Sequence, residues 1–146
     1  TCALPIWLDE AVTCFERLIR LKPDHADAMN DLGNALDGLR RRREALARYE
    51  QALHVRPGHI HARNGRANML QAFGRLDEAL PLVERNLEIQ RAHYDANDWL
   101  VGSAMEEVAR VLVKLEETGV RVDPATADAA PARRLRPRLL LHPELH

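Results

Sequence analysis

Two pairs of asparagines are the residues best suited to bind a ligand. Asn30 and Asn34 lie one helical turn apart, and Asn64 and Asn68 repeat that spacing 34 residues later. A carboxamide carries both a hydrogen-bond donor and an acceptor. Stacked carboxamides can therefore hold the backbone of an extended peptide with little selectivity for its sequence.

These asparagines belong to a longer row of polar positions. The row follows one face of a predicted helix over 25–38 and recurs one period later on a predicted helix over 59–73, because residues three and four apart share a helix face. The candidate peptide-binding groove consists of Asp27, Asn30, Asn34, Asp37, His61, Asn64, Asn68 and Gln71. Asp27 and Asp37 would favour a basic ligand. The alternative is that solvated asparagines simply cover a polar helix face.

Two other groups of polar residues are weaker candidates. The basic run Arg40–Arg43 either contacts phosphate or an acidic partner or, as we predict, is a solvated connection between two helices. His59 and His61, with His54 upstream, lack an evident third metal ligand. We therefore predict neither a metal nor a cofactor.

The sequence contains no catalytic motif. It has no glycine-rich phosphate loop, no His-Glu-x-x-His zinc motif and no Gly-x-Ser-x-Gly nucleophile motif. Cys14 has no paired base and is predicted to be a small packing residue. We predict no catalytic residues and no enzymatic activity for this chain.

The elements that position these residues repeat with the same offset. Ala11, Ala45 and Ala79 coincide when the chain is shifted by 34 residues. A period of this length without strand signals is typical of stacked helical hairpins, which usually form a binding surface. Apolar spacing and the placement of Pro and Gly predict helices over 7–22, 25–38, 42–55, 59–73, 76–91 and 97–118. Trp99 of the last helix is expected to pack in a core; the alternative, for Tyr94 as well, is an anchor at the edge of the groove.

Composition limits the classes of partner. The chain has 146 residues, 46% of them hydrophobic, which is enough for one domain of ordinary size. Its net charge of -1 gives no general attraction to nucleic acid or to membranes. No apolar run reaches the roughly 18 residues of a membrane-spanning helix, and two cysteines form no disulfide framework. These features favour the cytoplasm, although the compartment stays open.

One segment carries a family resemblance. Residues 29–36 read Met-Asn-Asp-Leu-Gly-Asn-Ala-Leu and are followed by Ala45, Tyr49, Ala52 and Pro57. The pattern resembles the tetratricopeptide repeat family, which has Leu-Gly between large residues in the first helix and small residues with an aromatic in the second. Residues 24–57 match well and residues 58–91 in part. The resemblance implies an all-α solenoid of helical hairpins, with about two full repeats plus a flanking helix on each side.

The candidate groove can be compared with two kinds of repeat groove. It resembles the asparagine-lined repeats of O-linked N-acetylglucosamine transferases, where the asparagine directly precedes Leu-Gly. Here those places hold Asp31 and Gly65. Repeat adaptors that grip a C-terminal carboxylate pair an asparagine, matched by Asn34, with a basic residue one turn earlier. That place holds Asn30, which disfavours this mode of binding.

We predict that the chain is divided into four parts. They are a non-native end at 1–6, repeats over 7–91 (7–23 partial, 24–57 and 58–91), an additional or capping helix within 92–119, and a disordered tail rich in Pro, Arg and Ala over 120–146. The chain is then a fragment of a longer protein. The helix within 7–23 leaves one face without a partner, which is a candidate surface for self-association.

The predicted function is a scaffold for protein–protein interactions. It would bind an extended peptide or a partner helix in its concave groove, with protein and not nucleic acid or membrane as the partner. One alternative is a repeat appendage of a larger enzyme, of glycosyltransferase or sulfotransferase type, whose catalytic domain is missing here. Another is a purely structural spacer.

Overall fold

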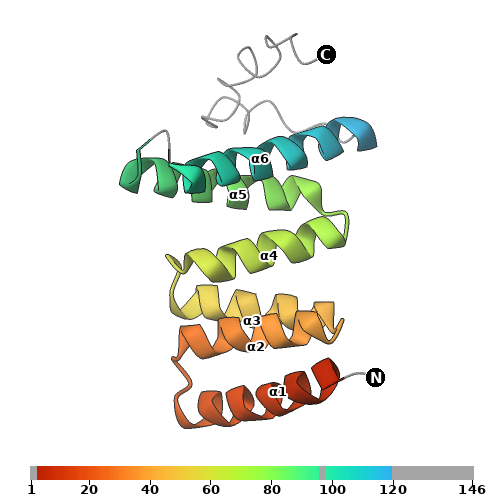
Figure 1. Cartoon of the computed structure of the whole chain (residues 1–146), viewed down its shortest axis with the longest axis vertical. Helices are drawn as coiled ribbons and strands as arrows, with labels where there is room; N and C mark the ends of the chain where they lie inside the picture. The colour runs from red at the N-terminus through yellow and green to blue at the C-terminus, as the bar shows by residue number, and fades with distance from the viewer. Residues whose placement is uncertain (1–2, 96–97, 120–146) are drawn as a thin grey trace. The chain divides into compact units, whose positions relative to one another are not determined.

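A computed structural model describes residues 3–95 and 98–119, with side chains from residue 6 onward. Within these ranges the regular elements are six α-helices (Figure 1). They are α1 (Ala3–Leu21), α2 (Ala26–Gly38), α3 (Arg42–Val55), α4 (Ile60–Ala72), α5 (Leu76–His93) and α6 (Trp99–Thr118). Contacts within the chain define two compact units, Thr1–Gly74 and Arg75–His146.

The predicted all-α repeat fold is confirmed in the described residues. Each of the predicted helices is present, with ends close to those expected. The main differences are that α1 begins at Ala3, inside the segment 1–6 that the sequence analysis interprets as a non-native end, and that α5 continues to His93. Residues 1–2 and the predicted disordered tail over 120–146 lie outside the described residues.

Histidines begin two of the helices in the first unit. The Nδ1 atom of His25 accepts a hydrogen bond from the backbone N–H of Ala28 at 3.1 Å. The Nδ1 atom of His59 accepts from the N–H of Ala62 at 3.2 Å. Each bond satisfies one of the N–H groups that a helix N-terminus leaves unpaired. The two histidines are 34 residues apart, so the helix start recurs with the repeat.

The first unit has one apolar core. Helix α2 packs against α1 and α3, and α4 packs against α3 and also contacts α2. The buried residues of this core are Val12, Met29, Leu32, Ala35, Leu36, Ala45, Tyr49, Ala52, Ala62 and Met69. The recurring alanines let helix backbones approach, and the larger side chains fill the space between them.

Helix α1 is only partly covered by this core. Its side chains Leu8, Phe15 and Ile19 pack against the core, whereas Ile6 and Trp7 are exposed. Exposed apolar side chains that lie together often mark an interaction surface. Self-association through this helix stays a prediction.

The second unit is formed by the pair α5 and α6, which pack against each other. The buried residues of α6 are Val101, Val108, Val111 and Leu115, which recur at helical spacing. Asp98 begins this helix, since its carboxylate accepts a hydrogen bond from the N–H of Leu100 at 3.0 Å. Gly119 ends it in the left-handed conformation, at φ 70°.

Two predictions about packing are wrong. Trp99 is 76% exposed, because it is the first residue of α6 and lies outside the apolar stripe of that helix. Cys14 is exposed as well, so it is not a packing residue. No helix in the described part of the chain is long and apolar enough to span a membrane.

Candidate functional site

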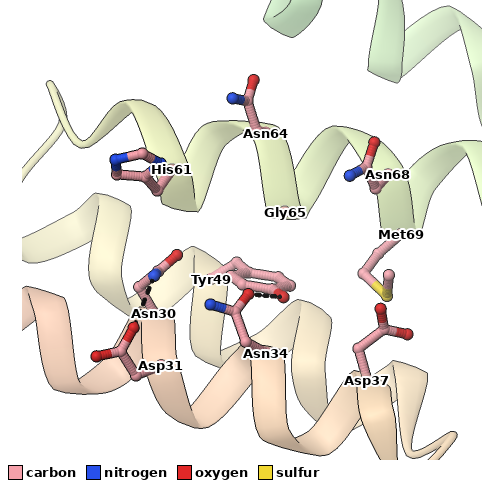
Figure 2. A pocket seen from close by; sticks show the side chains of 10 residues that line it. All are labelled: Asn30, Asp31, Asn34, Asp37, Tyr49, His61, Asn64, Gly65, Asn68 and Met69. Carbon is pink, nitrogen blue, oxygen red and sulfur yellow. Dashed lines mark hydrogen bonds between the residues drawn. The ribbon is translucent and has the colours of Figure 1, made fainter.

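A polar pocket opens between α2 and α4 in the first unit. Its volume is about 470 Å³, and Tyr49 of α3 lies at its back (Figure 2). The residues that line it are Asn30, Asp31, Asn34, Asp37, Tyr49, His61, Asn64, Gly65, Asn68 and Met69. Those from α2 and those from α4 each recur at helical spacing, so each set forms one face of its helix.

Most of the residues that we predicted from the sequence meet in this pocket. Asn30, Asn34, Asp37, His61, Asn64 and Asn68 line it. Asp27 and Gln71 do not. The two asparagine pairs thus lie on opposite walls, one on α2 and one on α4 (Figure 2).

Asp27 takes part in a different arrangement. Its carboxylate accepts hydrogen bonds from the Arg56 guanidinium at 3.0 and 3.1 Å and from Nε2–H of His59 at 3.0 Å. The hydrogen bond from Arg56 is the main reason why the pKa of Asp27 is lowered from its usual 3.8. Asp27 therefore links α2 to the end of α3 and the start of α4.

His59 is held in one tautomer by these contacts. Its Nδ1 atom accepts from the backbone of Ala62, so the proton is on Nε2, where it faces Asp27. The ring is buried and lies 6.1 Å from the exposed His61 ring in an edge-to-face arrangement. Among the residues that the structure describes, no three His, Cys, Asp or Glu residues are grouped so as to hold a metal ion.

Four lining residues were not predicted as part of the site: Asp31, Tyr49, Gly65 and Met69. Asp31 and Gly65 are equivalent positions in the repeat, next to Asn30 and Asn64 in sequence. Their place on the helix face could have been read from that spacing. In the sequence Tyr49 is the aromatic residue of the repeat pattern, and nothing there indicates that its ring also closes a pocket.

Tyr49 is wedged between two glycines on neighbouring helices. A Cβ atom added to Gly33 would lie 2.6 Å from the ring, and one added to Gly65 would lie 2.5 Å from it. The tyrosine is only 2% exposed, and its hydroxyl donates a 2.8 Å hydrogen bond to Oδ1 of Asn34. Burial, with the negative charge of Asp37 as a second cause, raises the pKa of Tyr49 to about 12.

Asn30 has an unusual hydrogen-bonding state. It is 6% exposed, and its Nδ2 donates to Oδ1 of Asp31 at 3.2 Å. Its own Oδ1 is buried and has no hydrogen-bond partner among the described residues. The amide orientation is set by its neighbour, since the opposite orientation would place the Asn30 oxygen against a carboxylate oxygen.

The arginine run lies at the start of α3. Arg41 forms a two-fold hydrogen-bonded ion pair with Glu44, at 2.7 and 2.6 Å, and Arg42 lies 3.8 Å from Asp37. Arg40 adopts a positive φ of 63° at the turn. Part of the run thus pairs with nearby carboxylates, in keeping with a connection between helices.

The chain belongs to the tetratricopeptide repeat family. The family model described as "Tetratricopeptide repeat" matches residues 8–41 and 30–92. No curated protein sequence matches the chain. The solved structure titled "MamA RS-1 ArsTM double mutant" is similar in fold, with a TM-score of 0.58 at 22% sequence identity. The likeness covers 84% of this chain and 70% of that chain.

This membership fixes the general class of function. Tetratricopeptide repeats are interaction modules in which stacked hairpins present a surface to protein partners. The chain is therefore a scaffold for protein interactions, of a fold that is typically non-catalytic.

Proposed function

We propose that the chain binds an extended segment of a partner protein in the pocket between α2 and α4. The observation that carries this proposal is the meeting of polar side chains from two equivalent helices around one opening of about 470 Å³. A surface patch of solvated asparagines would not require such an opening. The two walls of the pocket are equivalent helix faces with similar polar side chains. An extended segment can therefore make similar contacts with both walls.

The carboxamides supply the binding chemistry. An extended peptide presents N–H and C=O groups that its own backbone does not pair. Asn68 can serve both, since a carboxamide donates and accepts. Asn34 has its oxygen engaged by Tyr49, so it contributes the N–H donors of its amide to a peptide carbonyl. Contacts of this kind read the backbone more than the side chains.

The test uses the full chain and a displayed library of random peptides. Peptides enriched on the wild-type protein are measured against Asn68→Ala and against the double variant Asn34→Ala/Asn68→Ala. We expect weaker binding to the first and loss of binding to the second, with helical circular dichroism unchanged in both.

Gln71→Ala is the matched control. Gln71 is a carboxamide on the same helix as Asn68 but does not line the pocket, so its replacement should leave peptide affinity unchanged. Equal affinity of the selected peptides for wild type and for the folded double variant would refute the pocket as the binding site.

A further inference from the structure

The α2 wall of the pocket is acidic. Asp31 and Asp37 both line it, and none of the ten lining residues is Lys or Arg. Among the described residues Asp37 makes one long ion pair, with Nε of Arg42 at 3.8 Å. Asp31 is exposed, and its carboxylate makes no ion pair with any described residue. Two carboxylates at one opening without a lining cation attract positive charge.

Asn30 provides a second and independent indication of a ligand. A buried acceptor without a donor is uncommon in folded proteins and destabilises the state that contains it. Figure 2 shows the Asn30 oxygen directed from α2 toward α4, on the pocket side of the helix. A donor that enters beside Asp31 can pair with this oxygen after a rotation of the Asn30 amide. In the unliganded pocket no donor of the described residues reaches this oxygen.

Resting on the proposed function, we propose that Asn30 and Asp31 form a subsite for the guanidinium group of an arginine side chain in the bound segment. A guanidinium has five N–H donors and no acceptor, which complements a carboxylate next to an unpaired carbonyl oxygen. Its planar fork pairs with a carboxylate through two parallel hydrogen bonds, which the ammonium group of lysine cannot do. In the unliganded chain the Nδ2 of Asn30 holds the Asp31 carboxylate in place.

The probes are acetylated and amidated peptides of five residues, alanine throughout except at the centre. The central residue is arginine, lysine, citrulline or alanine. Citrulline has the shape of arginine without its charge. Each peptide is titrated into the full chain while the side-chain amide signals of Asn30, Asn34 and Asn68 are followed by nuclear magnetic resonance.

We expect the arginine peptide to bind about tenfold more tightly than the citrulline peptide, with lysine between them. Asp31→Asn keeps the acceptor for Asn30 but removes the charge, so it should abolish the preference for arginine. Asp9→Asn removes the same charge from an exposed position on α1 outside the pocket. This control variant should keep the preference for arginine. The preference should weaken as salt is added.

The outcomes separate this subsite from the groove that contains it. Equal shifts of Asn34 and Asn68 with all four peptides would overturn the arginine subsite and leave peptide binding in place. A preference for arginine that survives in Asp31→Asn would also overturn it. If the arginine peptide shifts none of the three amides, the subsite is wrong, while the displayed-peptide selection still decides the proposed function by itself.

Discussion

The hydroxyl group of Tyr49 donates a 2.8 Å hydrogen bond to Oδ1 of Asn34 and thereby joins the core of the first unit to the wall of its pocket. Tyr49 reaches this position from α3, behind the wall that α2 contributes. Asn34 thus has a structural partner as well as a place in the candidate site. Its replacement has consequences for stability that must be separated from those for binding.

Asn34→Ala should lower the free energy of unfolding by about 1–3 kcal/mol, because it leaves a buried hydroxyl without its acceptor. Tyr49→Phe removes that hydroxyl. In the Tyr49→Phe background, Asn34→Ala should therefore have a much smaller effect. Urea denaturation of the two single variants and the double variant measures this coupling. Additive effects of the two replacements would show that the hydrogen bond contributes nothing to stability.

The raised pKa of Tyr49 predicts a loss of stability at high pH. The unfolded chain ionises a tyrosine near 10.0, whereas Tyr49 in the fold ionises at about 12. Between these values the folded state binds more protons than the unfolded state, so the free energy of unfolding falls as pH rises. The full stabilisation is present below pH 10.0, and its loss across the window amounts to at most about 3 kcal/mol.

Tyr49→Phe should lack this part of the alkaline destabilisation. The phenolate absorbance of wild type minus that of Tyr49→Phe isolates Tyr49 from Tyr94, the only other tyrosine. We expect the difference signal to rise near pH 12. A difference signal with its midpoint at 10 would show that the ring is not held in the buried position described here.

The position of Tyr49 between Gly33 and Gly65 predicts that alanine at Gly65 destabilises the fold. Alanine in place of a helical glycine usually stabilises by about 0.5–1 kcal/mol. At Gly65 the new Cβ would lie 2.5 Å from the ring, which cannot retreat because Gly33 contacts it from the other side. Overpacking of this kind costs about 1–3 kcal/mol, so Gly65→Ala should be destabilising.

Gly102→Ala is the control for this prediction. Gly102 lies within α6, and a Cβ added there would meet nothing within 4 Å, so this variant should gain the helix propensity alone. Thermal unfolding of both variants measures the contrast. In a Tyr49→Leu background the penalty of Gly65→Ala should disappear. A penalty that persists there would mean that the ring is not its cause.

The helices could be predicted from the sequence because their limits are local. Proline, glycine and the apolar spacing define most of the helix ends, and the pattern of α2 and α3 recurs in α4 and α5. The same regularity placed the asparagines on two helix faces. It failed for Trp99 and Cys14, which are both exposed. Both are residue types common in cores, but one lies at the start of a helix and the other on an outer helix face.

The rest of the site depends on contacts between residues far apart in the chain. Asp27 was predicted to face the ligand because it continues the polar row of α2. Its partner Arg56 lies 29 residues later, at the end of another helix, and no spacing rule brings the two together. The unpaired oxygen of Asn30 is likewise a property of the packed helices. Neither could be predicted from residue types alone.

Asp27 therefore offers a test of a structural role against a binding role. Its pKa is lowered chiefly by the hydrogen bond from Arg56, so its contribution to stability is present above 3.8 and is lost as pH falls through the lower folded value. Wild type should be more stable than Asp27→Asn at neutral pH, and the difference should vanish in acid. Chemical denaturation at a series of pH values measures it.

Peptide affinity decides the second half of this test. The Asp27 carboxylate is paired with Arg56 and His59 and lies outside the pocket, so it does not contact the ligand. Asp27→Asn should therefore bind the selected peptides as tightly as wild type does. Asp31→Asn should behave in the opposite way, with stability nearly unchanged and binding of arginine reduced. If Asp27→Asn lost peptide affinity while its unfolding curve stayed that of wild type, Asp27 would be a ligand-binding residue and the link between α2, α3 and α4 would be incidental.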